Sequence, residues 1–152
     1  MINGIWTYRS YHNDTALIGA DASAALALIF GEGVFDLNVD DEARISGMLD
    51  MGDGYALTLS GTIDPGSADE TFDIVGLGID GTPTAGWRYD YRGMAGAMWP
   101  NAVTQVPCLL GTVIRVKPHG ANAPAGVTAS FVCVRRSDAP SLDATTHDPL
   151  HP

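Results

Sequence analysis

Basic residues are scarce in this sequence. Of its 152 residues only 8 are Lys or Arg, against 18 Asp or Glu, which gives a formal net charge of -10. Proteins that bind nucleic acids or anionic lipid surfaces hold the phosphates with clustered Lys and Arg side chains. The shortage therefore argues against a nucleic-acid partner and against docking on a membrane surface.

Long apolar runs are also missing. No segment reaches the roughly 18 to 20 uncharged apolar residues that a membrane-spanning helix requires. Residues 1–9 show neither a basic start followed by an apolar stretch nor a cleavage site, so no secretory signal is visible. We therefore expect a soluble, cytoplasmic protein.

The sequence has only two cysteines, Cys108 and Cys133, too few for a disulfide scaffold and too far apart for a zinc or redox pair. If the turn between their strands is centred between Gly120 and Ala121, the two residues lie opposite each other. A cross-strand disulfide is then conceivable, whereas a reducing compartment favours two free buried thiols. The sequence leaves this choice open.

Glycine and proline are plentiful, with 18 and 9 residues, which favours strands joined by tight turns over helices. Large apolar residues alternate with small or hydroxylated ones along 55–63, as in a half-buried strand. We predict an all-β fold, an eight-stranded antiparallel up-and-down β-barrel that closes on itself and leaves no exposed edge. The predicted strands are 4–11, 31–39, 43–51, 54–64, 70–79, 85–94, 108–117 and 125–136.

Two connections are longer than the others. The first contains an Ala-rich stretch, 21–28, which begins with an acidic residue and predicts a short helical lid. The second, 95–107, carries Met98-Trp99-Pro100-Asn101 and is expected to fold back over one end of the barrel. The domain prediction is a single barrel over 1–136 and a loose polar tail over 137–152.

Two short motifs at the ends of the barrel resemble the calycins, the group that includes lipocalins and avidins. They are Gly4-Ile5-Trp6 at the start of the first strand and Arg135-Arg136 at the end of the last. The resemblance implies that a basic residue of the final strand packs over the tryptophan. Antiparallel closure places these segments side by side, so a guanidinium can stack on the indole.

The sixth strand has one aromatic and one charged face. Trp87, Tyr89 and Tyr91 alternate with Arg88, Asp90 and Arg92. We expect the aromatic face to point into the barrel, because unpaired charges are rarely buried. The opposite orientation would create an inward polar site for an anion or for proton transfer.

The seventh strand is apolar on both faces. We expect one set to point inward, consisting of Leu110, Thr112, Ile114 and Val116. The other set is expected to face water, and it consists of Leu109, Gly111, Val113, Arg115 and Lys117.

The leading functional hypothesis is a barrel that binds an apolar or aromatic small molecule in its lumen, without a cofactor. The calycin resemblance implies the same function. The expected ligand-binding residues are Trp6, Tyr8, Leu57, Leu59, Trp87, Tyr89, Tyr91, Ile114, Phe131 and Arg135.

Two alternatives stay open, and with them the question of whether the protein is an enzyme. One is an isomerase or cyclase in which Asp90, Tyr89 or His119 acts as acid or base and Arg88 or Arg92 binds charge. The other is a module that forms homo-oligomers or docks a partner. Its expected interface is the apolar outer face of the last hairpin, with Leu109, Val113, Val132 and Val134.

Other apparent motifs lack the context that their chemistry needs. The glycines at 76, 78 and 81 have dinucleotide-fingerprint spacing, but a strand follows them instead of a helix. His12 and His119 are expected at the same barrel end, where Asp14 could complete a metal site. No tight ligand motif surrounds them, so we expect both to be loop histidines without a metal. We therefore expect no metal centre.

Overall fold

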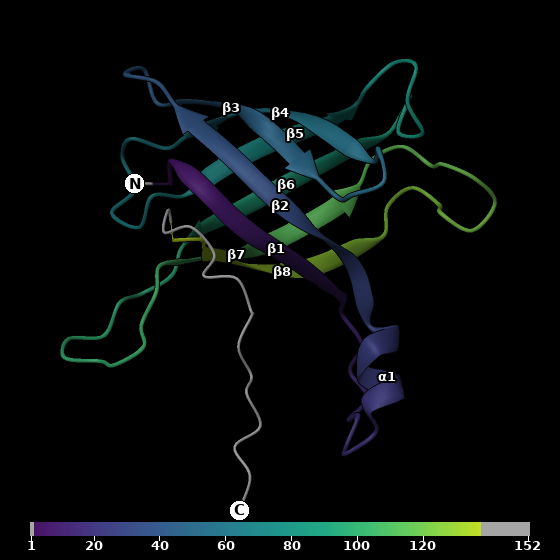
Figure 1. Cartoon of the computed structure of the whole chain (residues 1–152), viewed down its shortest axis with the longest axis horizontal. Helices are drawn as coiled ribbons and strands as arrows, with labels where there is room; N and C mark the ends of the chain where they lie inside the picture. Colours follow the sequence, from purple (N-terminus) through teal and green to yellow (C-terminus); the bar gives the residue numbers. More distant parts are fainter. Residues whose placement is uncertain (1, 138–152) are drawn as a thin grey trace, which may run out of the picture.

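The computed structural model describes residues 2–137 and shows eight antiparallel strands that close into a barrel (Figure 1). Each strand pairs with its sequence neighbours, and the last also pairs with the first, so the predicted up-and-down closed barrel is confirmed. The strands are β1 (Gly4–His12), β2 (Ile29–Val39), β3 (Arg44–Asp50), β4 (Ala56–Ile63), β5 (Phe72–Gly78), β6 (Arg88–Ala95), β7 (Cys108–Arg115) and β8 (Thr128–Arg135).

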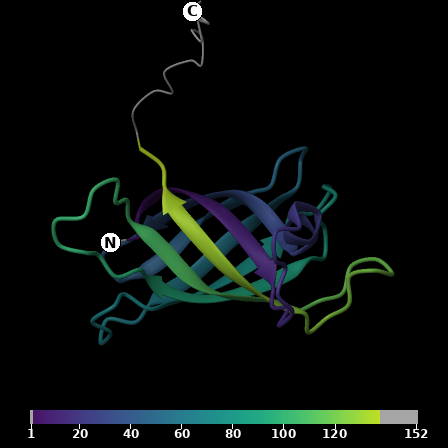
Figure 2. The same ribbon diagram turned by 90° about the horizontal axis from the view of Figure 1, so that it is seen from below.

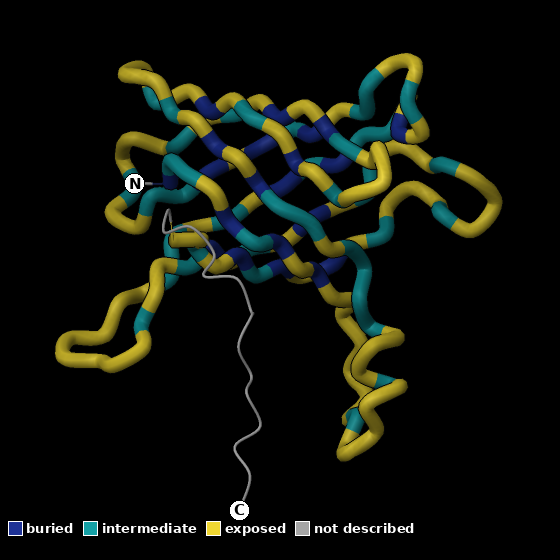
Figure 3. Tube along the Cα trace, viewed as in Figure 1, coloured by how far each residue is buried: buried dark blue, intermediate teal, exposed yellow. Residues whose placement is uncertain are grey.

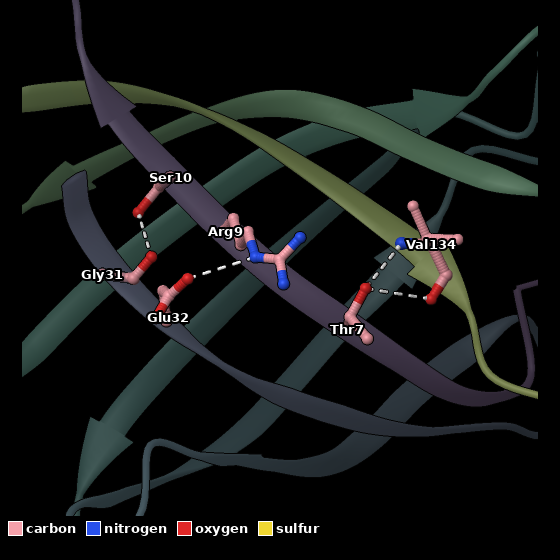
Figure 4. Close-up of polar contacts among 6 residues, drawn as sticks. All are labelled: Thr7, Arg9, Ser10, Gly31, Glu32 and Val134. Carbon is pink, nitrogen blue, oxygen red and sulfur yellow. Dashed lines mark hydrogen bonds and ion pairs between the residues drawn. The ribbon is translucent and has the colours of Figure 1, made fainter. Parts of the chain in front are cut away.

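Pairing between β1 and β8 closes the barrel, and Figure 2 shows the two strands next to each other. Side chains on β1 reinforce this closure (Figure 4). The Thr7 hydroxyl donates to the Val134 carbonyl and accepts from the Val134 amide, both at 3.3 Å. On the other side of β1, the Ser10 hydroxyl donates to the Gly31 carbonyl at 3.3 Å, and Arg9 pairs with Glu32 at 3.1 Å. The first strand is therefore tied to both of its neighbours.

Buried and exposed positions alternate along the strands, which gives the banded pattern in Figure 3. In β6 the Tyr89 and Tyr91 side chains are buried, whereas Arg92 is exposed and pairs with Asp73 at 2.8 Å. Asp90 also lies on the outer face, where it pairs with Arg88 at 3.0 Å. The expectation that the aromatic face of this strand points inward is confirmed.

The predicted orientation of β7 is wrong. Leu109 and Val113 are buried, and Leu110 and Ile114 are on the outer surface. Directly paired residues of antiparallel strands share a face, and Val113 pairs with the inward Tyr91. Because β7 is apolar on both faces, its own alternation does not show which face points inward. The pairing register with β6 determines the inward face.

The register of the β7–β8 hairpin also separates the cysteines. Cys133 pairs with Leu109 and is buried, while Cys108 pairs with Val134. The pairing register is thus shifted by one residue from the register that the predicted centre gives, and a shift of one residue moves a side chain to the other face. Both cysteines are free thiols.

The end of the barrel that holds the N-terminus is filled by side chains. Ile2 and Trp6 are buried, and the Trp6 indole donates a hydrogen bond to the Ile2 carbonyl at 2.9 Å. The Arg135 guanidinium lies 5.3 Å from the centre of the Trp6 ring. Gly4 has a φ of 123°, and a Cβ there would lie 2.7 Å from the Arg135 side chain. A glycine therefore makes room for the arginine over the tryptophan.

The long loops extend away from the barrel. The predicted helix forms as α1 (Ala22–Ala27), with the Asp21 side chain capping its first turn. None of its residues is buried, and it points away from the strands (Figure 1). The loop over 96–107 does not fold back over the barrel as expected, because Trp99 is 76% and Val103 85% exposed.

The predicted tail over 137–152 lies, except for Ser137, outside the described residues. Within the described residues, no helix has both the length and the apolar composition needed to cross a membrane.

Candidate functional site

A cavity of about 250 Å³ lies at the end of the barrel opposite Trp6. It is the end at which β1, β3, β5 and β7 finish and their partner strands begin, and the cavity is partly open to solvent. The lining is aromatic and aliphatic with two basic side chains, Arg115 and His119. It consists of Tyr8, Phe30, Gly31, Leu49, Met51, Tyr55, Leu57, Trp87, Tyr89, Tyr91, Arg115 and His119.

Half of the predicted ligand-binding set lines this cavity. The five residues are Tyr8, Leu57, Trp87, Tyr89 and Tyr91. All of them come from inward positions of β1, β4 and β6 or, for Trp87, from the residue just before β6. Their alternation in the sequence was enough to place them on the inner face.

The other half lies elsewhere. Trp6, Leu59 and Phe131 are buried in the packed core and do not line the cavity. Arg135 packs on Trp6 at the filled end. Ile114 is on the outer surface, 36% exposed, so its predicted place in the lumen is wrong. Among the described residues, the lumen is thus filled over part of its length, and the space for a ligand lies at its open end.

Sequence reasoning missed several lining residues. Phe30 and Tyr55 lie at or next to strand ends, where period-two alternation is shortest and gives the weakest signal. Arg115 was expected to face water because β7 had been oriented the wrong way. Leu49 and Met51 belong to β3 and the turn after it, and the alternation Leu49-Asp50-Met51 carried a usable signal.

Three polar side chains meet at the rim of this cavity. The Tyr89 hydroxyl accepts a hydrogen bond from the Arg115 Nε at 3.0 Å and lies 2.5 Å from the His119 Nε2. The imidazole stacks on the Trp87 ring, with 3.7 Å between ring centres and 13° between planes. A 3.2 Å hydrogen bond from the Arg115 Nη1 to the Pro124 carbonyl fixes the guanidinium.

The electrostatics of the rim favour a neutral imidazole. Burial, and then the neighbouring Arg115 charge, lower the pKa of His119 below its ordinary value of 6.5. A neutral His119 whose Nε2 is unprotonated accepts the Tyr89 proton, which gives a chain of donors from Arg115 through Tyr89 to His119. Deeper in the cavity, burial raises the pKa of Tyr8 and of Tyr91, so both phenols stay protonated.

The structure brings together two of the three predicted acid or base residues. Tyr89 and His119 are in contact at the cavity, whereas Asp90 faces the outer surface and is held there by Arg88. A molecule in the lumen therefore does not meet the Asp90 carboxylate.

No predicted metal or dinucleotide motif forms a site in the described part of the chain. Residues 2–137 contain no group of three His, Cys, Asp or Glu side chains that could hold a metal ion, and the His12 ring packs edge-on against Phe30. After Gly78 the chain turns back along the sheet. A Cβ on this glycine would lie 1.6 Å from the Thr84 carbonyl, so the glycine serves close backbone packing.

Comparison with known proteins found no matching family model, no matching curated protein and no matching solved structure.

Proposed function

We propose that this protein binds one small apolar or aromatic molecule in the cavity at the open end of its barrel. The observation that carries the proposal is the aromatic lining of a cavity placed where a small barrel meets solvent. Such sites are mostly apolar, with a few polar groups that orient the ligand. Arg115, Tyr89 and His119 supply those groups here.

The volume limits the ligand to a small one. A dry cavity of roughly 150 Å³ holds benzene, and drug-sized ligands need about 300 Å³ or more. The cavity of about 250 Å³ lies between these sizes. It suits one aromatic ring with a short side chain.

A calycin-like assignment belongs to this proposal. Two features support it: the closed eight-stranded meander, and the guanidinium of Arg135 over the Trp6 ring beside Gly4. This contact is the one that the resemblance implied. Binding small molecules at one barrel end would then be the function expected of the fold.

The test uses cinnamamide, a neutral aromatic molecule of suitable size, in calorimetric titration and in amide NMR. We expect saturable one-site binding with shifts at β1, β4 and β6 around the cavity. Gly31→Leu should abolish it, because a Cβ at Gly31 lies 3.7 Å from the Tyr8 ring and a longer side chain would fill the space.

The control is Thr58→Leu, which places the same leucine side chain at an exposed position of β4, outside the barrel. This variant should bind as the wild type does. Absence of binding to the wild type, or equal binding to Gly31→Leu, would contradict the proposal.

A second candidate, an isomerase or cyclase, rests on the contact between Tyr89 and His119 at the cavity wall. A phenol and a neutral imidazole in contact can pass a proton to or from a bound molecule. The test is turnover of the small molecule that native mass spectrometry finds retained by the protein. Loss of turnover in Tyr89→Phe and His119→Gln, with retained binding, would favour the enzyme.

A further inference from the structure

Arg115 is the only permanently charged side chain among the described residues that line the cavity. Its guanidinium is half-buried and lies 4.9 Å from the centre of the Phe30 ring. The lining contains no carboxylate. The aromatic cavity thus has a single positive charge at its rim.

The protein leaves this charge without a counterion in residues 2–137. The described ion pairs join Arg9, Arg44, Arg88 and Arg92 to carboxylates, but Arg115 has none within 4.0 Å. Its two protein hydrogen bonds go to neutral acceptors, the Tyr89 hydroxyl and the Pro124 carbonyl, through Nε and Nη1. Nη2 therefore keeps both of its N–H groups for another acceptor.

Among the described residues Arg115 has no carboxylate partner, although carboxylates are abundant in this chain. The formal net charge is -10, so carboxylates outnumber cations by more than two to one, and a partner for Arg115 would be easy to supply. A half-buried cation that lacks a counterion costs free energy unless something pairs with it. The neighbouring His119 stays neutral near pH 7, so the charge available to a ligand is one.

We propose that the ligand is an amphipathic monoanion, an aromatic or apolar body with one carboxylate that pairs with Arg115. The body occupies the cavity between Tyr55, Trp87 and Leu57, and the carboxylate takes hydrogen bonds from Nη2 and the remaining Nη1 proton. The planar fork of a guanidinium matches the two oxygens of a carboxylate. A dianion would keep one charge unbalanced at the rim. The inference rests on the proposed function and names the class of ligand.

The experiment compares cinnamate with cinnamamide, which have nearly the same shape and differ in charge. Titration calorimetry of the full chain near pH 7 should show cinnamate binding about tenfold or more tightly, the ratio expected for a charge-assisted hydrogen bond. In Arg115→Gln the ratio should fall close to one while cinnamamide still binds, which shows that the cavity is intact. Arg92→Gln, which removes a cation from the outer face of the adjoining strand, should leave the ratio unchanged.

The outcomes separate the inference from the proposed function. Equal binding of both compounds to the wild type leaves a small-molecule site but overturns the anionic ligand. An unchanged preference for cinnamate in Arg115→Gln overturns the role of Arg115. No binding of either compound overturns both proposals.

Discussion

At the scale of single residues, the rim of the cavity depends on a few side chains that hold one another in place. His119 lies flat on Trp87 and touches the Tyr89 hydroxyl, which in turn accepts from Arg115. His119 comes from the loop between β7 and β8, while Tyr89 comes from the start of β6 and Trp87 from the residue just before it. A loop residue is therefore fixed against the sheet by stacking and by a hydrogen bond.

This arrangement predicts a pH dependence of stability. Because the pKa of His119 is below 6.5 in the folded protein, the unfolded chain binds more protons as the pH falls through that range. The free energy of unfolding should therefore decrease as the pH falls below about 6.5. Urea unfolding at pH 7.5 and pH 5.5 should show a larger loss for the wild type than for His119→Gln.

An NMR titration of the His119 ring checks the cause directly. Its midpoint should lie below 6.5. A midpoint at or above that value, or an equal loss of stability in the variant, would contradict the prediction. The pKa of Asp40 is lowered from an ordinary value of 3.8, so this carboxyl group titrates at a lower pH than His119. It therefore does not contribute to the predicted change between pH 7.5 and pH 5.5.

At the scale of elements, the β5–β6 connection shows how a loop beside the cavity is held. Thr84 is fully buried in this loop, which is unusual for a polar side chain outside a strand. Its hydroxyl donates to the Ala56 carbonyl at 2.7 Å and accepts from the Ile79 amide at 3.1 Å. The loop is thereby tied to the start of β4, and it positions Trp87 at the cavity.

Replacing Thr84 by Val should destabilise the protein by about 1–3 kcal/mol, because the shape is kept while two partly buried backbone groups lose their partner. Thr84→Ser keeps the hydroxyl and should cost less. Thr58→Val, at an exposed position of β4, should change stability by no more than about 0.5 kcal/mol. Chemical denaturation of the three variants measures the differences. A Thr84→Val protein as stable as the wild type would show that these hydrogen bonds contribute nothing.

At the scale of the whole molecule, the outer surface of the barrel is not uniformly polar. Apolar side chains on adjoining strands β7, β8 and β1 are 36–44% exposed, and they are Leu110, Ile114, Val134 and Ile5. Part of the predicted interface, Leu109 and Val113, is inside the barrel, and the corrected orientation puts Leu110 and Ile114 in its place. Adjoining exposed apolar residues are typical of protein–protein contacts.

We therefore expect the protein to self-associate through this outer face at high concentration. Sedimentation velocity should show an association that depends on concentration, and Leu110→Gln should reduce it. Met48→Gln is the matched control, because Met48 is equally exposed at 44% but lies on β3, across the ring of eight strands. A wild type that stays monomeric at every concentration would exclude this interface.

The number and positions of the strands followed from the sequence, as did the inward-facing residues of the more regular strands. Period-two alternation and turn residues are local properties, so all eight strands were located, and the inward aromatics of β6 were assigned correctly. The stacking of Arg135 on Trp6 was expected from a resemblance, and closure of the meander brings the two together.

Only the tertiary structure decided the orientation of β7, the open and filled ends of the barrel, and the grouping of Arg115 with Tyr89 and His119. Both faces of β7 are apolar, so its own pattern is the same in either orientation, and pairing with β6 makes the choice. Cavity space depends on how side chains from several strands fill the lumen, which no local pattern contains. The sequence thus determined the barrel and most of its strand faces, while the register between strands determined the site.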